Sequence, residues 1–163
     1  MKENVIYSSS VRKLNDELGT SFPEQAIYYH LYQLDNTIEN RALFDVWEAD
    51  IWIPAKKIVI EYDGSYYHSL KTAVERDNKK NIFFAESGIR LIRVKDTSEH
   101  VLEHWNNDHS ILYYHPDNNY MNLGVVISML IKEIFSKEVS IEINHIEIYN
   151  RYIELRKEHS LQA

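Results

Sequence analysis

Four acidic residues in one short stretch of the chain could act together on a cation, namely Glu48, Asp50, Glu61 and Asp63. If residues 54–57 form a turn, Asp50 falls opposite Glu61, and Glu48 falls opposite Asp63. Side chains alternate between the two faces of a strand, so all four acids would point the same way. Directly opposed Cβ atoms lie roughly 5 Å apart, where like charges are destabilising. The pattern therefore predicts a bound divalent cation or protonated carboxyls, with a solvated acidic strand face as the alternative.

A β-hairpin must position these acids, and its turn is predicted at Pro54–Lys57. Strands rich in β-branched and aromatic residues flank the turn at Asp45–Ile53 and Lys57–Tyr62. A four-residue turn places Ile53 opposite Ile58. The register of the whole hairpin, and therefore the opposition of the acids, depends on that pair.

A helix and a parallel strand are predicted to follow the hairpin. Thr72–Ser87 has the apolar spacing of a helix and ends at Gly88. Ile89–Val94 is mainly apolar on both alternating faces, one of which carries Arg93. This composition is typical of an inner strand, reached by a helical crossover and parallel to the strand before the helix.

The remaining elements complete an α/β fold. Ser21 as N-cap, Pro23 in the first turn and Glu24 three residues after the cap predict a helix that ends at about Leu34. The other expected elements are helices at Ser8–Leu18, Ser98–Trp105, Tyr120–Phe135 and Ile146–His159, and strands at Ser110–His115 and Val139–Ile143. We expect one domain over residues 1–163, with a mixed-sheet core at about 20–95 flanked by helices and a mainly helical C-terminal extension at about 96–163.

Composition limits the classes of protein to consider. The chain has 163 residues, a formal net charge of −7 and no cysteine, which excludes disulfides and thiolate zinc sites. It lacks an apolar signal core at its start and any run long enough to span a membrane, so a cytoplasmic protein without a membrane partner is expected. The negative charge argues against coating nucleic acid through bulk charge. Most of the acidic excess follows residue 95, which leaves room for a local basic surface near the hairpin.

The stretch from Glu24 to Val94 resembles the PD-(D/E)XK nuclease superfamily, in the branch around the very-short-patch-repair endonucleases. The resemblance covers less than half of the chain and depends on an ordered set of motifs, none of which is distinctive alone. These motifs are Phe22-Pro-Glu24, Glu48-Ala-Asp50-Ile-Trp-Ile-Pro54, Ile60-Glu61-Tyr-Asp63-Gly64-Ser-Tyr-Tyr-His68, Arg76-Asp77-Asn-Lys-Lys80 and Gly88-Ile-Arg-Leu-Ile-Arg93. The resemblance implies a restriction-endonuclease-like fold and hydrolysis of phosphodiester bonds in DNA with Mg²⁺ or Mn²⁺.

Carried over position by position, the resemblance implies a role for each of four residues. Asp50 matches the motif aspartate that bridges the catalytic metal and the scissile phosphate. Glu61 matches the acid of the following strand, and Glu24 matches a helix glutamate that holds a metal or its water. His68 lies where the repair branch has a loop histidine near the phosphate. Hard oxygen ligands of this kind suit Mg²⁺ or Mn²⁺ over zinc.

Two departures from the family pattern bear on the chemistry. Ala49 stands where the motif aspartate is usually preceded by proline, which is a mild change. Asp63 occupies the position of the E-X-K lysine, so the usual strand lysine is absent. The following helix could supply a lysine, Lys80 in preference to Lys79, or His68 could take the proton-handling role.

Basic residues of this helix could also contact a phosphate backbone. Arg76 and Lys80 are one helical turn apart and present two cations on the same face. The alternatives are a surface ion pair between Arg76 and Asp77, and plain solvated charge at Lys79 and Lys80.

The acids and the histidine also have structural interpretations. Glu24 could serve as the acid of a capping box, a role that is compatible with metal binding. Asp63 with its following glycine could end the strand as a turn, and Glu48 could lie at the rim of the site. His68 could be an ordinary loop histidine.

Two classes of function are therefore carried forward. The first is a metal-dependent endonuclease that nicks DNA or cleaves both strands, with RNA as a weaker substrate candidate. The alternative is a catalytically weak or inactive nuclease-fold module that binds nucleic acid or a protein partner in phage or host defence. A homodimer is also conceivable, because the apolar face of Tyr120–Phe135 could be either core or a dimer interface.

Overall fold

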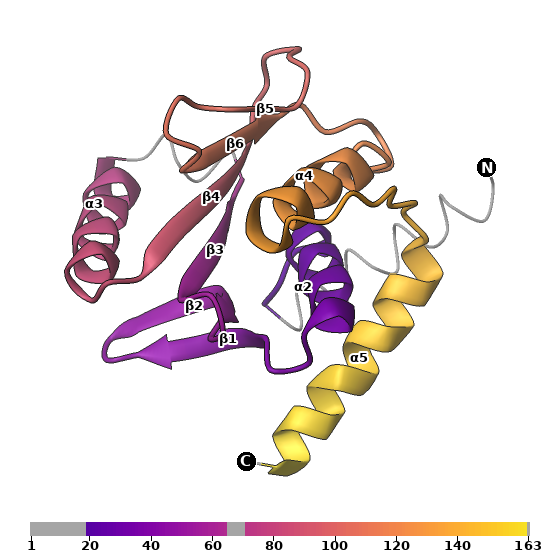
Figure 1. The fold of residues 1–163 in the computed structure, drawn as a ribbon, viewed down its shortest axis with the longest axis horizontal. Helices are drawn as coiled ribbons and strands as arrows, with labels where there is room; N and C mark the ends of the chain where they lie inside the picture. Colours follow the sequence, from indigo (N-terminus) through magenta and orange to yellow (C-terminus); the bar gives the residue numbers. More distant parts are fainter. Residues whose placement is uncertain (1–18, 65–70, 163) are drawn as a thin grey trace. The chain divides into compact units, whose positions relative to one another are not determined.

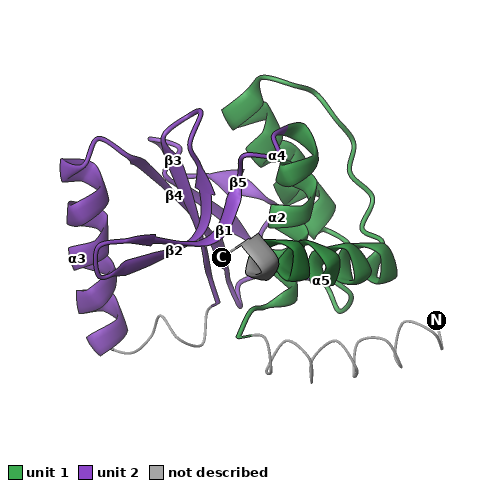
Figure 2. Cartoon of the chain, turned by 90° about the horizontal axis from the view of Figure 1, so that it is seen from below, with its two compact units in different colours: residues 1–34, 117–163 green, residues 35–116 purple. Residues whose placement is uncertain are grey.

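The computed structural model describes residues 19–64 and 71–162, which fold into two compact units. Unit 1 contains residues 1–34 and 117–163, and unit 2 contains residues 35–116 (Figure 2). The expected helix at Ser8–Leu18 and the position of His68 lie outside the described residues. The boundaries fall after residues 34 and 116, whereas the sequence suggested a core that ends near residue 95.

Unit 2 contains a six-stranded mixed sheet with strand order β1-β2-β3-β4-β6-β5 (Figure 1). The strands are β1 (Glu39–Phe44), β2 (Trp47–Ile53), β3 (Ile58–Asp63), β4 (Arg90–Asp96), β5 (His104–Trp105) and β6 (Ile111–Tyr114). The pairs β1–β2, β2–β3 and β5–β6 are antiparallel, and β3–β4 and β4–β6 are parallel. The predicted α/β class with a mixed sheet is confirmed at this level.

The turn of the central hairpin has the predicted length and register. The Lys57 amide donates to the Pro54 carbonyl at 3.3 Å, and Ile53 lies opposite Ile58. Pairing between β2 and β3 continues to Ile51 and Ile60, where the backbone register ends. Beyond that point β2 remains paired with β1, a strand that the sequence did not predict because half of its residues are polar and none of its residues is buried.

The crossover helix α3 (Lys71–Glu86) connects β3 to the parallel strand β4, as predicted. Buried Phe84 on α3 packs with Val59 of β3 and Ala49 of β2. Partly buried aromatic and aliphatic residues surround this cluster, namely Phe44, Trp47, Trp52, Phe83, Ile89 and Leu91. This packing fixes α3 against the sheet face that carries Val59, and alternation places Glu61 on the same face.

The segment after β4 differs from expectation. The helix predicted at Ser98–Trp105 is wrong, because only His104 and Trp105 have regular structure there and both belong to strand β5. Trp105 pairs with Leu112 of β6 and stacks on His109 with ring centroids 5.1 Å apart. Pairing with β6 thus satisfies the local backbone groups, which overrides a weak helical pattern. The strand expected at Ser110–His115 is confirmed as β6.

Unit 1 consists of the helices α2 (Phe22–Leu34), α4 (Leu123–Phe135) and α5 (His145–Gln162) among its described residues. The N-terminal signal of α2 is confirmed, because the Glu24 amide donates to the Ser21 hydroxyl at 3.3 Å. On α4 one face is buried, which favours the core interpretation of its apolar residues. The edge strand expected at Val139–Ile143 is wrong, since these residues have no regular secondary structure. None of the described helices combines the length and the apolar character that crossing a membrane requires.

Candidate active site on the central strands

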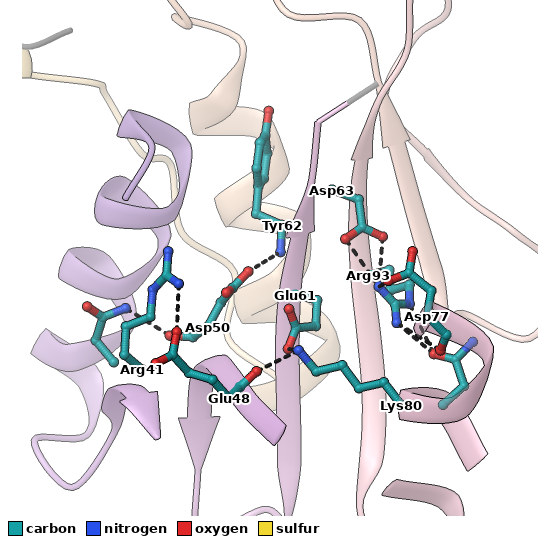
Figure 3. Close-up of polar contacts among 11 residues, drawn as sticks. Arg41, Glu48, Asp50, Glu61, Tyr62, Asp63, Asp77, Lys80 and Arg93 are labelled. Carbon is teal, nitrogen blue, oxygen red and sulfur yellow. Dashed lines mark hydrogen bonds and ion pairs between the residues drawn. The ribbon is translucent and has the colours of Figure 1, made fainter. Parts of the chain in front are cut away.

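Asp50 lies where β2 stops pairing with β3. Its carboxylate Oδ2 accepts a hydrogen bond from the Tyr62 amide at 2.9 Å, so the side chain takes an acceptor role that a backbone carbonyl has in a regular ladder (Figure 3). On the other side, the Asn40 side chain donates to the Asp50 carbonyl at 2.8 Å. The aspartate therefore turns toward β3, and its carboxylate lies beside that of Glu61.

Glu61 is a buried carboxyl, with 6% of the residue exposed. Burial is the main cause that raises its pKa, the neighbouring Asp50 carboxylate raises it further, and the Lys80 ammonium lowers it, to a final value of about 8. The two acids are thus close enough to compete for charge in a poorly solvated position. The repulsion between two such carboxylates is reduced when a proton or a cation binds, and these are the two outcomes that the spacing of the acids predicted.

Lys80 of α3 supplies a cation to this pair. Its Nζ lies 2.6 Å from Glu61 Oε1 and donates to the Glu48 carbonyl at 2.5 Å, with 13% of the side chain exposed (Figure 3). The helix thereby brings a lysine to the acid whose own strand carries none. Lys79, by contrast, is exposed on the same helix.

Asp63 binds an arginine of β4 and does not join the pair of acids. Both of its oxygens accept hydrogen bonds from Arg93 Nη1, at 3.1 and 2.9 Å, and both residues are buried. The residue is the last of β3, where it is paired with Lys95, so it is not a partner for Glu48.

Glu48 does not lie opposite Asp63, although the sequence predicted that it would. It pairs with Leu43 of β1, and its carboxylate lies 2.7 Å from Arg41 at an exposed edge. The prediction that Glu48 falls opposite Asp63 is therefore wrong, because β2 leaves β3 at Asp50. The four acids separate into one convergent pair and two acids that each bind an arginine.

The other residues selected from sequence are spread over the chain. Glu24 is buried in α2, which belongs to unit 1, whereas the convergent pair belongs to unit 2. Arg76 is exposed on α3, and Asp77 Oδ1 lies 3.9 Å from Arg93 Nη1. Among residues 19–64 and 71–162, no group of three or more histidine, aspartate or glutamate side chains is arranged to hold a metal.

Two residues that connect the strands of the site to α3, Arg93 and Asn81, were not predicted as site residues from the sequence. Arg93 donates from Nε and Nη2 to the Asn81 side-chain oxygen, at 3.1 and 2.8 Å. The available signal was an arginine on a mainly apolar strand face, because a buried guanidinium requires partners. Nothing in the sequence identified Asn81 as one of them.

The donor set at Asp50 and Glu61 fits a hard divalent cation. Both side chains offer carboxylate oxygens, and the proximity of partly buried Asp50 to buried Glu61 makes a positive charge favourable there. Two carboxylates would leave coordination positions for water and phosphate. Comparison of the chain with family models, with curated proteins and with solved structures found no match.

Proposed function

We propose that this protein is a Mg²⁺- or Mn²⁺-dependent endonuclease that hydrolyses phosphodiester bonds in DNA. The observation that carries the proposal is the convergence of Asp50 and Glu61 from adjacent strands, with Lys80 of α3 placed 2.6 Å from Glu61. Two acids and a lysine in one partly buried place are what such hydrolysis needs, since it must neutralise a phosphate and activate a water.

Asp50 and Glu61 would hold the ion, which when bound supplies positive charge for the phosphoryl oxygens and an acidified water. Asp50 is held in place by the Tyr62 amide, so its orientation does not depend on the ion. Glu61 is kept from solvent, which strengthens its electrostatic interactions with any charge placed beside it.

Lys80 would have the role that a lysine of the strand has in the family pattern. Its ammonium beside Glu61 can donate a hydrogen bond to a water or to a non-bridging phosphate oxygen. The exposed Arg76, one turn earlier on α3, would contact the phosphate backbone.

The restriction-endonuclease-like fold is part of the same proposal. It is supported by the succession of an antiparallel hairpin, a crossover helix and a parallel strand, with the two acids at adjacent strand positions near the helix. Fold analogy alone does not establish an activity, so the proposal depends on the site.

A non-catalytic module that binds nucleic acid or a protein partner is the second candidate. The specific observations in its favour are that Lys80 already offsets the charge of Glu61, and that Asp63 binds Arg93 where the family has lysine. In that case the acids and the lysine would form a structural ion pair with no ion between them.

The test is cleavage of supercoiled plasmid DNA with Mn²⁺ or Mg²⁺, with single-stranded RNA and DNA as parallel substrates. We expect metal-dependent nicking or linearisation of DNA by the wild-type protein. Asp50→Asn and Glu61→Gln should each reduce the rate by on the order of a thousandfold or more, because several kcal/mol of charge stabilisation are lost.

Glu48→Gln is the matched control, since Glu48 is an acid of the same hairpin whose exposed carboxylate binds partly buried Arg41 instead. It should cleave at close to the wild-type rate. Undiminished wild-type cleavage in excess chelator would overturn the proposed chemistry. Cleavage of RNA alone would reassign the substrate, and tight metal-independent binding of DNA without cleavage would favour the second candidate.

A further inference from the structure

Arg93 makes an unusually complete set of contacts for a residue that sequence analysis did not select. It is 6% exposed, and its guanidinium reaches both oxygens of Asp63 on β3. On α3 it binds the Asn81 side-chain oxygen twice and the Asp77 carbonyl at 3.5 Å. One buried side chain on β4 therefore connects a neighbouring strand to the crossover helix.

The contacts on α3 flank the lysine of the proposed site. Asp77 and Asn81 are one helical turn apart, and Lys80 lies three residues after Asp77 and next to Asn81. Residues three and four apart share a helix face, so the face that Arg93 binds is continuous with the one that presents Lys80. A rotation or shift of α3 would move these residues together.

The position of Arg93 in the sheet is also informative. It is the direct neighbour of Glu61 in the parallel register between β3 and β4, on the same face. Adjacent strands are only about 4.8 Å apart, which is well within the reach of an arginine. The guanidinium nevertheless binds Asp63, two residues further along β3, and leaves Glu61 to Lys80 and Asp50.

We propose that Arg93 is a positioning residue that holds α3 so that the Lys80 ammonium faces Glu61, and that Asp63 retains the Arg93 guanidinium away from Glu61. The importance of this contact for cleavage rests on the proposed function. The contact itself can be tested without metal, substrate or activity. Arginine suits the role because its planar guanidinium group is always charged and can bind an acid and helix oxygens simultaneously.

The direct test measures how fast each lysine is acetylated by N-hydroxysuccinimidyl acetate, with peptide mass spectrometry to separate Lys79 from Lys80. Asn81→Leu removes the two shortest contacts of Arg93 with α3 and preserves the Arg93–Asp63 pair, so the fold is expected to survive. We expect the acetylation rate of Lys80 to rise about tenfold in this variant, because the contact with Glu61 that shields its ammonium opens. Lys79, which is already exposed, should keep its rate.

Asn81→Asp is the conservative variant, because it retains an oxygen acceptor for Arg93 and should keep Lys80 protected. Arg93→Gln should expose Lys80 as Asn81→Leu does. Arg90→Gln is its matched control, since Arg90 is an exposed arginine of the same strand that binds the His109 carbonyl, and it should leave Lys80 protected. Unchanged Lys80 acetylation in folded Asn81→Leu would overturn the proposal. If Arg93→Gln does not fold, Asn81→Leu alone remains the deciding test.

Cleavage kinetics separate this inference from the proposed function. If the protein is a nuclease, Asn81→Leu should lower kcat at nearly constant KM, whereas Asn81→Asp should restore kcat. If wild-type protein cleaves no nucleic acid, the proposed function fails, yet exposure of Lys80 in Asn81→Leu still supports the positioning role. If cleavage is metal-dependent but Lys80 stays protected in Asn81→Leu, only the positioning role fails.

Discussion

Glu61 and Asp63 lie two residues apart on β3 and share a face, yet their partners give them different chemical characters. Asp63 is bound by the guanidinium of Arg93, which satisfies its charge within the fold. Glu61 is buried beside Asp50 with only the Lys80 ammonium to offset it, and its pKa is raised to about 8. At the scale of the residue, burial and neighbouring charge select Glu61 rather than Asp63 as the acid that is available to a cation.

The raised pKa of Glu61 has a consequence for stability. Because the folded state holds its proton up to about pH 8 and the unfolded state releases it near pH 4.5, the stabilising contribution is fully present below pH 4.5 and is lost as the pH rises to about 8. We expect the free energy of unfolding to fall across this range with a contribution of at most about 1.4 kcal/mol per pH unit. Glu61→Gln should remove this contribution, as measured by urea denaturation at a series of pH values.

Glu48→Gln provides the control for that titration. Glu48 is an exposed acid of the same hairpin, with 46% of its side chain accessible, and its replacement should preserve the contribution of Glu61 between pH 4.5 and 8. A wild-type protein and a Glu61→Gln variant with the same slope between pH 4.5 and 8 would show that Glu61 is ionised in the folded state throughout this range.

At the scale of the element, two features of unit 2 create the candidate site. The strand β2 is paired with β1 from Trp47 to Trp52 but with β3 only from Ile51 to Ile53, and beyond Ile51 the Asp50 carboxylate accepts a hydrogen bond from the Tyr62 amide of β3. The crossover helix α3 packs on the sheet through Phe84 and carries Lys80 to Glu61. The site is therefore supported by a strand pair and a helix, which position side chains more firmly than loops do.

In unit 1, close packing at Gly124 leads to a prediction about helix α4. A Cβ at this position would overlap the backbone carbonyl of Ile141, which cannot rotate aside as a side chain can. We expect Gly124→Ala to be destabilising, because overpacking of about 1–3 kcal/mol or more outweighs the gain of about 1 kcal/mol in helix propensity. Chemical denaturation measures the difference in the free energy of unfolding.

Val125→Ala is the matched control on the same helix. Val125 is about half exposed, so this substitution should change the free energy of unfolding by no more than about 0.5 kcal/mol. Equal or greater stability of Gly124→Ala would mean that the segment around Ile141 moves aside at little cost.

At the scale of the whole molecule, the net charge of −7 and the position of the acids have to be considered together. The convergent pair lies in unit 2, where residues 35–116 contain 14 acidic side chains and 10 lysine or arginine side chains. A divalent cation bound at Asp50 and Glu61 would stabilise the folded chain, because the unfolded chain has no preformed pair of carboxylates to bind it.

This binding should be visible in thermal or chemical unfolding. With Mn²⁺ at a hundred times its Kd, we expect the free energy of unfolding to increase by about 2.7 kcal/mol. Asp50→Asn should abolish the increase, and Glu48→Gln should preserve it. An equal stabilisation of wild-type protein and Asp50→Asn by Mn²⁺ would place the bound ion elsewhere on the chain.

Much of the fold was predictable because its signals are local. The Ser21 cap, the turn at Pro54–Lys57 and the apolar strand that contains Arg93 each depend on a few neighbouring residues, and the structure contains the corresponding elements. The wrong expectations, a helix at Ser98–Trp105 and a strand at Val139–Ile143, concern short segments with weak periodicity. There, tertiary context outweighs intrinsic propensity, which spans only about 1 kcal/mol per residue.

By itself, the sequence determined that acids of a hairpin lie near each other, that the strand position two residues after Glu61 holds aspartate instead of lysine, and that the next helix carries lysines. Only the tertiary structure decided which acids converge and which lysine reaches them. Asp50 meets Glu61 where β2 stops pairing with β3 while it stays paired with β1, and Lys80 is presented because Phe84 and the contacts of Arg93 fix the rotation of α3. These choices depend on long-range packing and on competition between charges, which local patterns in a sequence do not encode.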